Sequence, residues 1–252
     1  LPWYGGALRE RLMSGVGPYA LTRLALETGG EFTILDRPGE STGFDLDVMK
    51  GYLPDYGDAA EIMAQVKASP FRTAIMQAVA ATYRPTNLSP PRIRFPTVRS
   101  DFYPFTESVY YVAPAEFRQQ LLGALAQECA RVQQSAEVLE AAIRHFGDDD
   151  WESSYEKEPA ARWRAWYDLT RGRLLMMSIR HQEYLATCKW IAAAGNLAPA
   201  TNTLSFVPGK QLLEDQPDIA ARREIALRLL NRCLERHAGT PWALLAEWEL
   251  EA

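Results

Sequence analysis

Two stretches of the chain repeat apolar residues at alternating intervals of three and four. A repeat that averages 3.5 residues keeps one row of side chains against a partner helix over several turns. Residues 125–146 and 163–191 are therefore expected to form two long helices that pack lengthwise as a slender rod. The first row consists of Leu125, Cys129, Val132, Ala136, Leu139, Ile143 and Phe146. The second row consists of Trp163, Tyr167, Thr170, Leu174, Met177, His181, Tyr184, Cys188 and Ile191.

The segment between the two rows favours a reversal of the chain. It runs from Gly147 to about Pro159 and begins with three acidic residues, Asp148 to Asp150. A connection of this length lets the two helices run antiparallel. Three consecutive aspartate side chains do not converge easily on one ion, so a helix-capping turn is favoured over a metal site. The expected fold is mainly α, with a long antiparallel helical hairpin or bundle.

A further helix pair is predicted near the C-terminus. An amphipathic pattern runs from Ile219 to Leu234, and Thr240 with Pro241 is typical of the start of a last helix. Residues 234–243 resemble a junction inside a tetratricopeptide-like helix pair. Because no period of about 34 residues recurs along the chain, we expect at most one such pair, docked on the long hairpin.

The composition sets limits on the class of protein. Hydrophobic residues make up 47% and charged residues 23%, which is ordinary for a folded domain. The net charge of -5 argues against nucleic acid or an anionic membrane surface as the main partner. No run of about eighteen apolar residues is present, so no membrane span is expected. Three cysteines in helical patterns cannot form a closed disulfide set and are interpreted as small core residues.

The first forty residues have a different pattern from the rest. A helix is predicted to begin near Pro18 and to end at Gly29-Gly30, and a short β-prone run, 32–35, follows. One helix and one strand are only part of an α/β unit, because a strand needs neighbours in a sheet. The remaining strands are therefore expected outside this sequence. The chain also starts at Leu1 without a basic and apolar leader, which favours a piece of a longer protein.

This region carries a resemblance to a known family. Residues 15–24 (GVGPYALTRL) and 27–30 (ETGG), with the strand behind them, resemble the end of a von Willebrand factor type A (VWA) domain. They are similar in particular to large planctomycete proteins in which that domain is followed by a helical C-terminal region. Residues 162–169 and 239–246 look like the same group. The resemblance implies an α/β remnant, but the Asp-x-Ser-x-Ser metal loop of type A domains is absent here, so no metal site is transferred.

These patterns divide the chain into three parts. Residues 1–40 are the expected VWA-like helix and strand. Residues 41–112 hold a short helical hairpin, capped at Asp58, and a proline-rich linker. Residues 113–252 form the helical bundle with the tetratricopeptide-like pair. The linker is locally basic through Arg92 and Arg94, and it is interpreted as a packed connector, with a docking strap for a partner as the alternative.

One short motif suggests an enzyme. Residues 39–43 match the G-x-S-x-G pattern of serine hydrolases, and His145, His181 and His237 follow it. A nucleophile elbow needs a strand-to-helix turn on a sheet, whereas three residues separate this motif from the predicted strand and the sequence after it is largely helical. A polar loop is therefore favoured, and a hydrolase that uses Ser41 is kept as the alternative. His181 falls on the second apolar row and is interpreted as a hydrogen-bonded core residue.

The function that these features favour is a noncatalytic protein-protein interaction or scaffold module attached to a VWA-type domain. Its expected partner is another protein or the missing part of its own VWA domain. Metal-dependent adhesion through an upstream VWA metal site is a third alternative. No catalytic residue, metal ligand or cofactor is assigned, and the bacterial cytoplasm and the cell envelope both remain open as compartments. The candidate interaction surface consists of Trp163, Trp166, Trp242, Trp248, Arg92 and Arg94, although packing in a core or interface is the favoured role of the four tryptophans.

Overall fold

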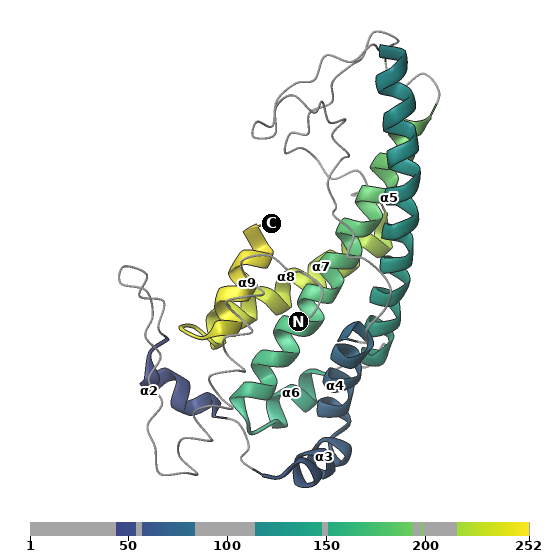
Figure 1. Cartoon of the computed structure of the whole chain (residues 1–252). Coiled ribbons are helices and arrows are strands. Elements are labelled where there is room, and N and C mark those ends of the chain that lie inside the picture. The colour runs from purple at the N-terminus through teal and green to yellow at the C-terminus, as the bar shows by residue number, and fades with distance from the viewer. Residues whose placement is uncertain are drawn as a thin grey trace, which may run out of the picture.

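The computed structural model describes residues 44–53, 57–83, 114–147, 151–193, 198 and 216–251. Every secondary-structure element in these ranges is a helix (Figure 1), which confirms the expected mainly α character. The elements are α2 (Leu46–Met49), η1 (Lys50–Tyr52), α3 (Ala59–Ala68), α4 (Pro70–Tyr83), α5 (Pro114–Ile143), η2 (Arg144–Phe146), α6 (Glu152–Lys157), α7 (Ala161–Ala192), α8 (Pro217–Arg236) and α9 (Pro241–Glu251). The predicted VWA-like piece, Ser41, Asp148 to Asp150 and the proline-rich linker lie outside the described residues.

The long hairpin is present, formed by α5 and α7. The Ser178 hydroxyl donates a hydrogen bond of 2.6 Å to Glu140, near the end of α5 and the middle of α7. Toward the other end, Leu125 of α5 shares a core cluster with Tyr184 and Ile191 of α7. The two helices therefore run antiparallel, as predicted, and they lie side by side along the tall edge of the molecule in Figure 1.

The buried row of α5 is displaced from the predicted one at every second position. Ser135 and Ala142 are fully buried, whereas their apolar neighbours Ala136 and Ile143 are only partly buried. Residues three and four positions after the buried Val132 or Leu139 lie near the same helix face. The apolar pattern alone selects the more hydrophobic residue of each pair. The small side chains take the centre of the interface, and Ser135 satisfies its hydroxyl on the Arg131 carbonyl at 2.9 Å.

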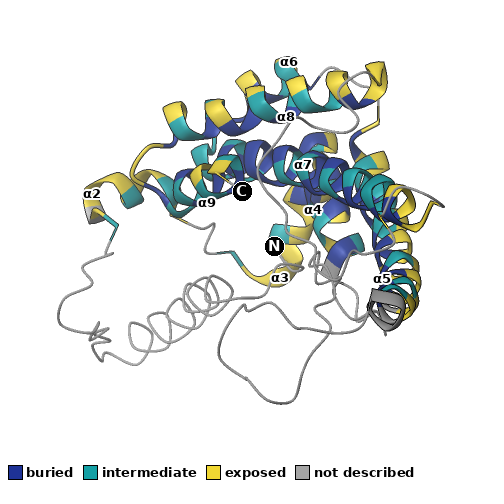
Figure 2. Cartoon of the chain, turned by 90° about the horizontal axis from the view of Figure 1, so that it is seen from above, coloured by how far each residue is buried: buried dark blue, intermediate teal, exposed yellow. Residues whose placement is uncertain are grey.

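Helix α7 is the centre of a bundle over its first half. From Trp163 to Ile179 it has buried residues on every side, because α4, α5, α8 and α9 all pack against it. Figure 2, a view from above coloured by burial, shows α7 among its neighbouring helices. The expected slender rod is therefore wrong for this part of the chain. The apolar row of α7 predicted contact with one partner helix. A helix whose apolar residues extend beyond one face must instead pack against several helices.

The two shorter helix pairs form where the sequence predicts them. Asp58 caps α3 in a capping box with Glu61, and the chain turns at Ser69 into α4. Helix α8 ends at Arg236, and α9 begins at Pro241 after Gly239, which adopts a φ of 73°. Both α8 and α9 dock on α7. Their likeness to a tetratricopeptide pair stays a prediction.

Among the helices described, none combines the length and the apolar character that a bilayer crossing requires.

Candidate functional site

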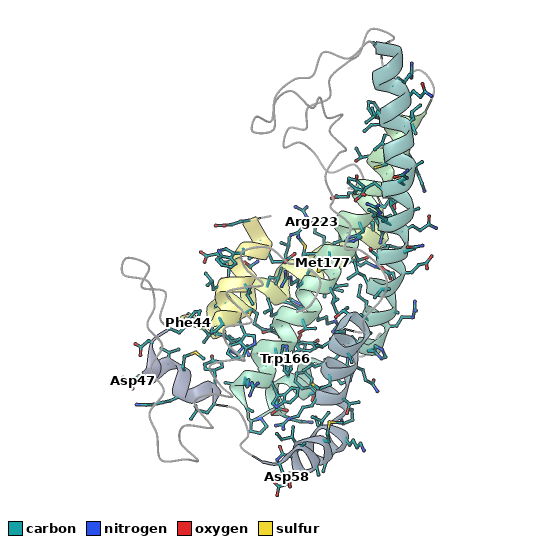
Figure 3. All side chains as sticks on the ribbon, in the orientation of Figure 1. Phe44, Asp47, Asp58, Trp166, Met177 and Arg223 are labelled. Atoms are coloured by element: carbon teal, nitrogen blue, oxygen red, sulfur yellow. The ribbon has the colours of Figure 1, made fainter. Side chains whose placement is uncertain are left out.

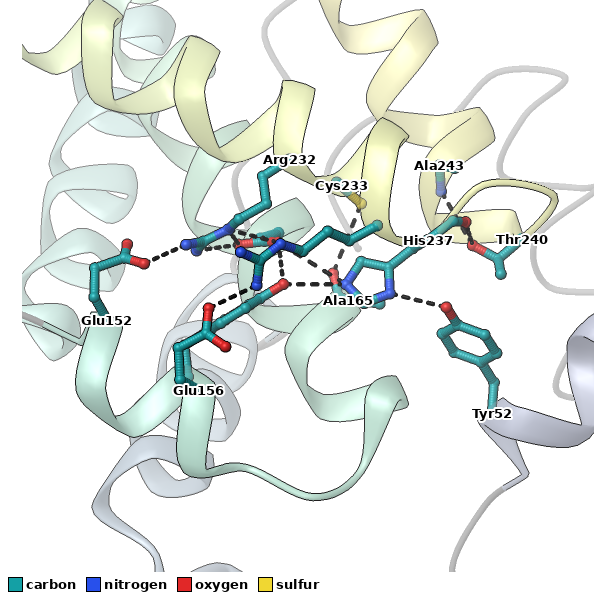
Figure 4. Close-up of polar contacts among 12 residues, drawn as sticks. Tyr52, Glu152, Glu156, Ala165, Arg232, Cys233, His237, Thr240 and Ala243 are labelled. Carbon is teal, nitrogen blue, oxygen red and sulfur yellow. Dashed lines mark hydrogen bonds and ion pairs between the residues drawn. The ribbon is translucent and has the colours of Figure 1, made fainter.

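A group of buried and half-buried polar side chains surrounds Asp168, and Figure 4 draws its contacts. Asp168 lies on α7 in the middle of an otherwise apolar stretch, and its side chain is 0% exposed. Arg232 of α8 binds both oxygens of this carboxylate, with its Nη2 at 2.6 Å from Oδ1 and its Nε at 3.1 Å from Oδ2. Such a forked pair fixes geometry as well as charge, because two parallel bonds leave the guanidinium little freedom to turn.

The same guanidinium connects α8 to α6. Its Nη1 contacts Glu152, and its centre lies 3.8 Å from the ring centre of Tyr155. The Tyr155 hydroxyl donates a hydrogen bond of 2.9 Å to Asp168 Oδ2. Arg232 therefore holds together the short helix α6 and the two long helices α7 and α8.

His237 continues the group toward the surface. Its Nε2 lies 3.3 Å from the Tyr155 hydroxyl, and its Nδ1 lies 2.9 Å from the hydroxyl of Tyr52 in η1. Tyr155 has a single hydroxyl hydrogen, which goes to Asp168, so its oxygen accepts from Nε2–H of His237. Nδ1 then accepts from Tyr52, and one neutral tautomer satisfies the whole chain of bonds.

Burial shifts the pKa values inside this group in the direction of neutral forms. Burial and the nearby Arg164, Arg232 and Arg236 guanidinium groups lower the pKa of His237 to about 4. Burial raises the pKa of Asp168 to about 6, although Arg232 and Tyr155 act in the opposite direction. At neutral pH the histidine is therefore uncharged, and its 3.9 Å approach to Asp168 is not an ion pair.

A second buried acid lies on α9. Glu249 forms ion pairs with two arginines of α7. Arg173 Nε lies 2.9 Å from its Oε2, and Arg180 Nη1 lies 2.5 Å from its Oε1. The two arginines are one heptad apart, and their side chains are 11% and 23% exposed. Both arginines therefore pair with the same buried acid. These bonds anchor the last helix to the centre of the bundle.

The four tryptophans of the candidate surface fall into two separate core clusters. Trp163 is buried and lies 5.2 Å from Trp166 between ring centres, within the cluster of α4, α5 and α7. Trp242 and Trp248 pack instead on the cluster formed by α7, α8 and α9. The labelled side chain of Trp166 can be followed in Figure 3. Arg92 and Arg94 lie outside the described residues.

The three histidines of the hydrolase alternative have different surroundings. His145 is exposed, and His237 is enclosed by tyrosines. His181 is 0% exposed, and its Nδ1 lies 2.7 Å from the Met177 carbonyl oxygen of its own helix. The prediction of a hydrogen-bonded core histidine is confirmed. Its Nε2 has no hydrogen-bond partner among the described residues.

No group of three or more His, Cys, Asp or Glu side chains in the described ranges is placed to hold a metal ion. No protein-family model, curated protein or solved structure matches the chain. The resemblances to VWA domains and tetratricopeptide pairs therefore stay predictions.

Sequence reasoning missed the residues of the Asp168 group. One signal was present, since Asp168 interrupts an apolar run between Tyr167 and Leu169 on a helix predicted to be buried. An acid in such a place requires a partner. Its partner Arg232 gives no such signal, because it lies 64 residues away on a helix with several other arginines.

Proposed function

We propose that the chain is a noncatalytic protein-protein interaction or scaffold module, attached to a VWA-type domain. The observation that carries the proposal is a two-helix arm at one end of the bundle. The arm consists of residues 118–135 of α5 and 181–192 of α7. Among the described residues, its core cluster contains side chains of these two helices alone, whereas the main cluster draws on seven elements.

The buried polar groups support a structural role for the bundle. Asp168, Glu249 and Glu140 each bind arginines from another helix, and these bonds fix the helices relative to one another. A rigid body that presents a projecting arm suits a module that positions or spaces a partner. Trp190, near the end of the arm, is 54% exposed, and an aromatic side chain of this kind is typical of binding surfaces.

Photo-crosslinking from the arm tests the proposal. A benzophenone amino acid placed at Trp190 in the full chain, inside the source organism, is expected to give one discrete crosslinked product that mass spectrometry identifies. The matched control is the same substitution at Met63, a 46% exposed side chain on the body, which is expected to give no such product. An equal pattern from both positions would contradict a role for the arm.

The hydrolase alternative has its own test. Stoichiometric labelling by a fluorophosphonate probe, lost in Ser41→Ala, would replace the scaffold proposal with a catalytic one. Titration of the chain with magnesium in a calorimeter addresses adhesion through a metal site, and we expect no heat of binding from this sequence.

A further inference from the structure

The arm contains two cysteines that face each other from opposite helices. Cys188 of α7 belongs to the core cluster of the arm together with Tyr184, and Cys129 of α5 packs against the same cluster. All three cysteines of the chain are free thiols in this structure. Three cysteines cannot form a closed set of disulfides, but this number does not exclude one pair.

The helix register supports this juxtaposition independently. Cys129 lies eleven residues before Glu140 on α5, and Cys188 lies ten residues after Ser178 on α7. Glu140 and Ser178 are in direct contact at 2.6 Å. Because the helices are antiparallel, nearly equal steps of roughly 16 Å in opposite directions along the two chains arrive at facing positions.

We propose that Cys129 and Cys188 form a reversible disulfide that cross-links the two helices of the arm. A disulfide requires the two Cα atoms to lie about 4.4–6.8 Å apart, so a close approach of α5 and α7 at these two positions is part of the proposal. The bond would join the two helices at the smaller of their core clusters, to which no third helix of the described part of the chain contributes.

The two thiols have different surroundings, which sets the order of the reaction. Cys129 is half-buried, whereas Cys188 is 1% exposed. Burial and the neighbouring Cys129 raise the pKa of Cys188 to about 12, so this thiol stays protonated at neutral pH. Cys129 is therefore the group that meets an oxidant first, and Cys188 is the resolving thiol.

A small disulfide such as oxidised glutathione supplies the oxidising equivalents. The Cys129 thiolate attacks one of its sulfur atoms, a mixed disulfide forms and one glutathione thiolate leaves. Cys188 then gives up its proton, attacks the Cys129 sulfur and releases the second glutathione. Two protein thiols are oxidised to one disulfide, and one glutathione disulfide is reduced to two thiols.

Cys233 provides a matched control within the same chain. It is fully buried in the cluster of α7, α8 and α9, and its Sγ lies 4.0 Å from the Ala165 carbonyl oxygen. It belongs to a different core from the other two cysteines. It should therefore take no part in the bond.

Oxidation of the full chain followed by mass spectrometry tests the proposal. The reduced protein is equilibrated with oxidised glutathione, its remaining thiols are alkylated, and the tryptic peptides are mapped. We expect a mass loss of about 2 Da from the intact chain and a peptide pair linked through Cys129 and Cys188. Cys233→Ala should give the same link, and Cys129→Ala should give none.

Thermal unfolding gives a second readout that does not depend on a variant. Closing a loop of this length should raise the Tm of the oxidised chain by about 5–10 °C, and a phosphine reductant should reverse the rise. Glutathione retained on Cys129 without an internal link would overturn the proposal. A link that joins two chains, or one that includes Cys233, would also overturn it.

Discussion

Arg232 and Asp168 are joined by a forked ion pair across 64 residues of sequence, and both side chains are withdrawn from solvent. The carboxylate is 0% exposed and the guanidinium 12%. This pair determines how α8 lies on α7, since its two bonds set the orientation of one helix against the other. The hydrogen bond from Tyr155 and the contact with Glu152 bring α6 into the same arrangement.

Removal of one partner of this pair should strongly destabilise the fold. Arg232→Ala leaves Asp168 buried without its counter-charge, and we expect the free energy of unfolding to fall by about 3–5 kcal/mol. The matched control is Arg236→Ala, one turn further along α8, where the arginine pairs with Glu156 and both side chains are about half exposed. That change should cost less than about 1 kcal/mol. Urea unfolding of both variants measures the difference, and equal losses would contradict the assigned role of Arg232.

Gly172 lies on α7 at a point where α8 packs tightly against it. A Cβ atom at this position would lie 2.9 Å from Leu230 Cγ, which is itself fully buried. Gly172→Ala gains about 1 kcal/mol of helix propensity but overpacks the interface, so we expect a net loss of about 1 kcal/mol. Gly123→Ala on α5 is the control, because its Cβ meets nothing within 4 Å and the change should stabilise by about 0.5–1 kcal/mol. If the Tm values of both variants change in the same direction, this packing argument is contradicted.

The sequence contained enough information for the longer helices, α3 to α5 and α7 to α9, but not for the short elements α2, η1 and α6. Periodicity predicted α5 and α7, and local chemistry predicted the starts of α3 at Asp58 and of α9 at Pro241. These features depend on neighbouring residues, so they can be recognised without knowledge of the fold.

The arrangement of the polar groups could not be predicted in the same way. Arg180 and Glu249 meet across 69 residues, and Arg232 and Asp168 across 64. Any of several arginines on α7 and α8 offers the same charge, and only the packing of the bundle selects the partner. The cysteine pair of the arm was missed for a related reason, because an odd cysteine count argued against a complete set of bonds and gave no information on one contact.

The stability of the fold should depend on the protonation of His237. Its pKa is about 4 in the folded chain and about 6.5 when unfolded, so the unfolded chain binds more protons between these values. The contribution of His237 to the free energy of unfolding is then fully present above pH 6.5 and is lost as the pH falls toward 4. Asp168 acts in the opposite direction, since its raised pKa favours the folded chain below about pH 6.

Comparison with a variant isolates the histidine contribution. His237→Gln cannot take up this proton, so the stability advantage of the wild-type chain over it should shrink by about 2 kcal/mol between pH 7.5 and pH 5. Urea unfolding at the two pH values measures the change. An advantage that stays constant, or that grows on acidification, would show that His237 does not resist protonation in the fold.

Tyr52 should control whether residues 44–53 stay on the body. Its ring stacks on Trp242 at 5.5 Å between centres, and its hydroxyl lies 2.9 Å from His237 Nδ1. Most of the neighbouring side chains are exposed, including Lys50, a site for trypsin. Tyr52→Ala removes both contacts, and we expect cleavage after Lys50 to become about tenfold faster, while cleavage within α7 stays slow.

Tyr52→Phe separates the two contributions. It keeps the stacking on Trp242 and loses only the hydroxyl, so cleavage should rise by a few-fold, in keeping with about 0.5–1.5 kcal/mol for one hydrogen bond. Timed proteolysis followed by mass spectrometry gives both rates. If the alanine variant is cleaved at the wild-type rate, other contacts hold residues 44–53 on the body. The bond between Tyr52 and His237 would then result from the position of this segment and would not determine it.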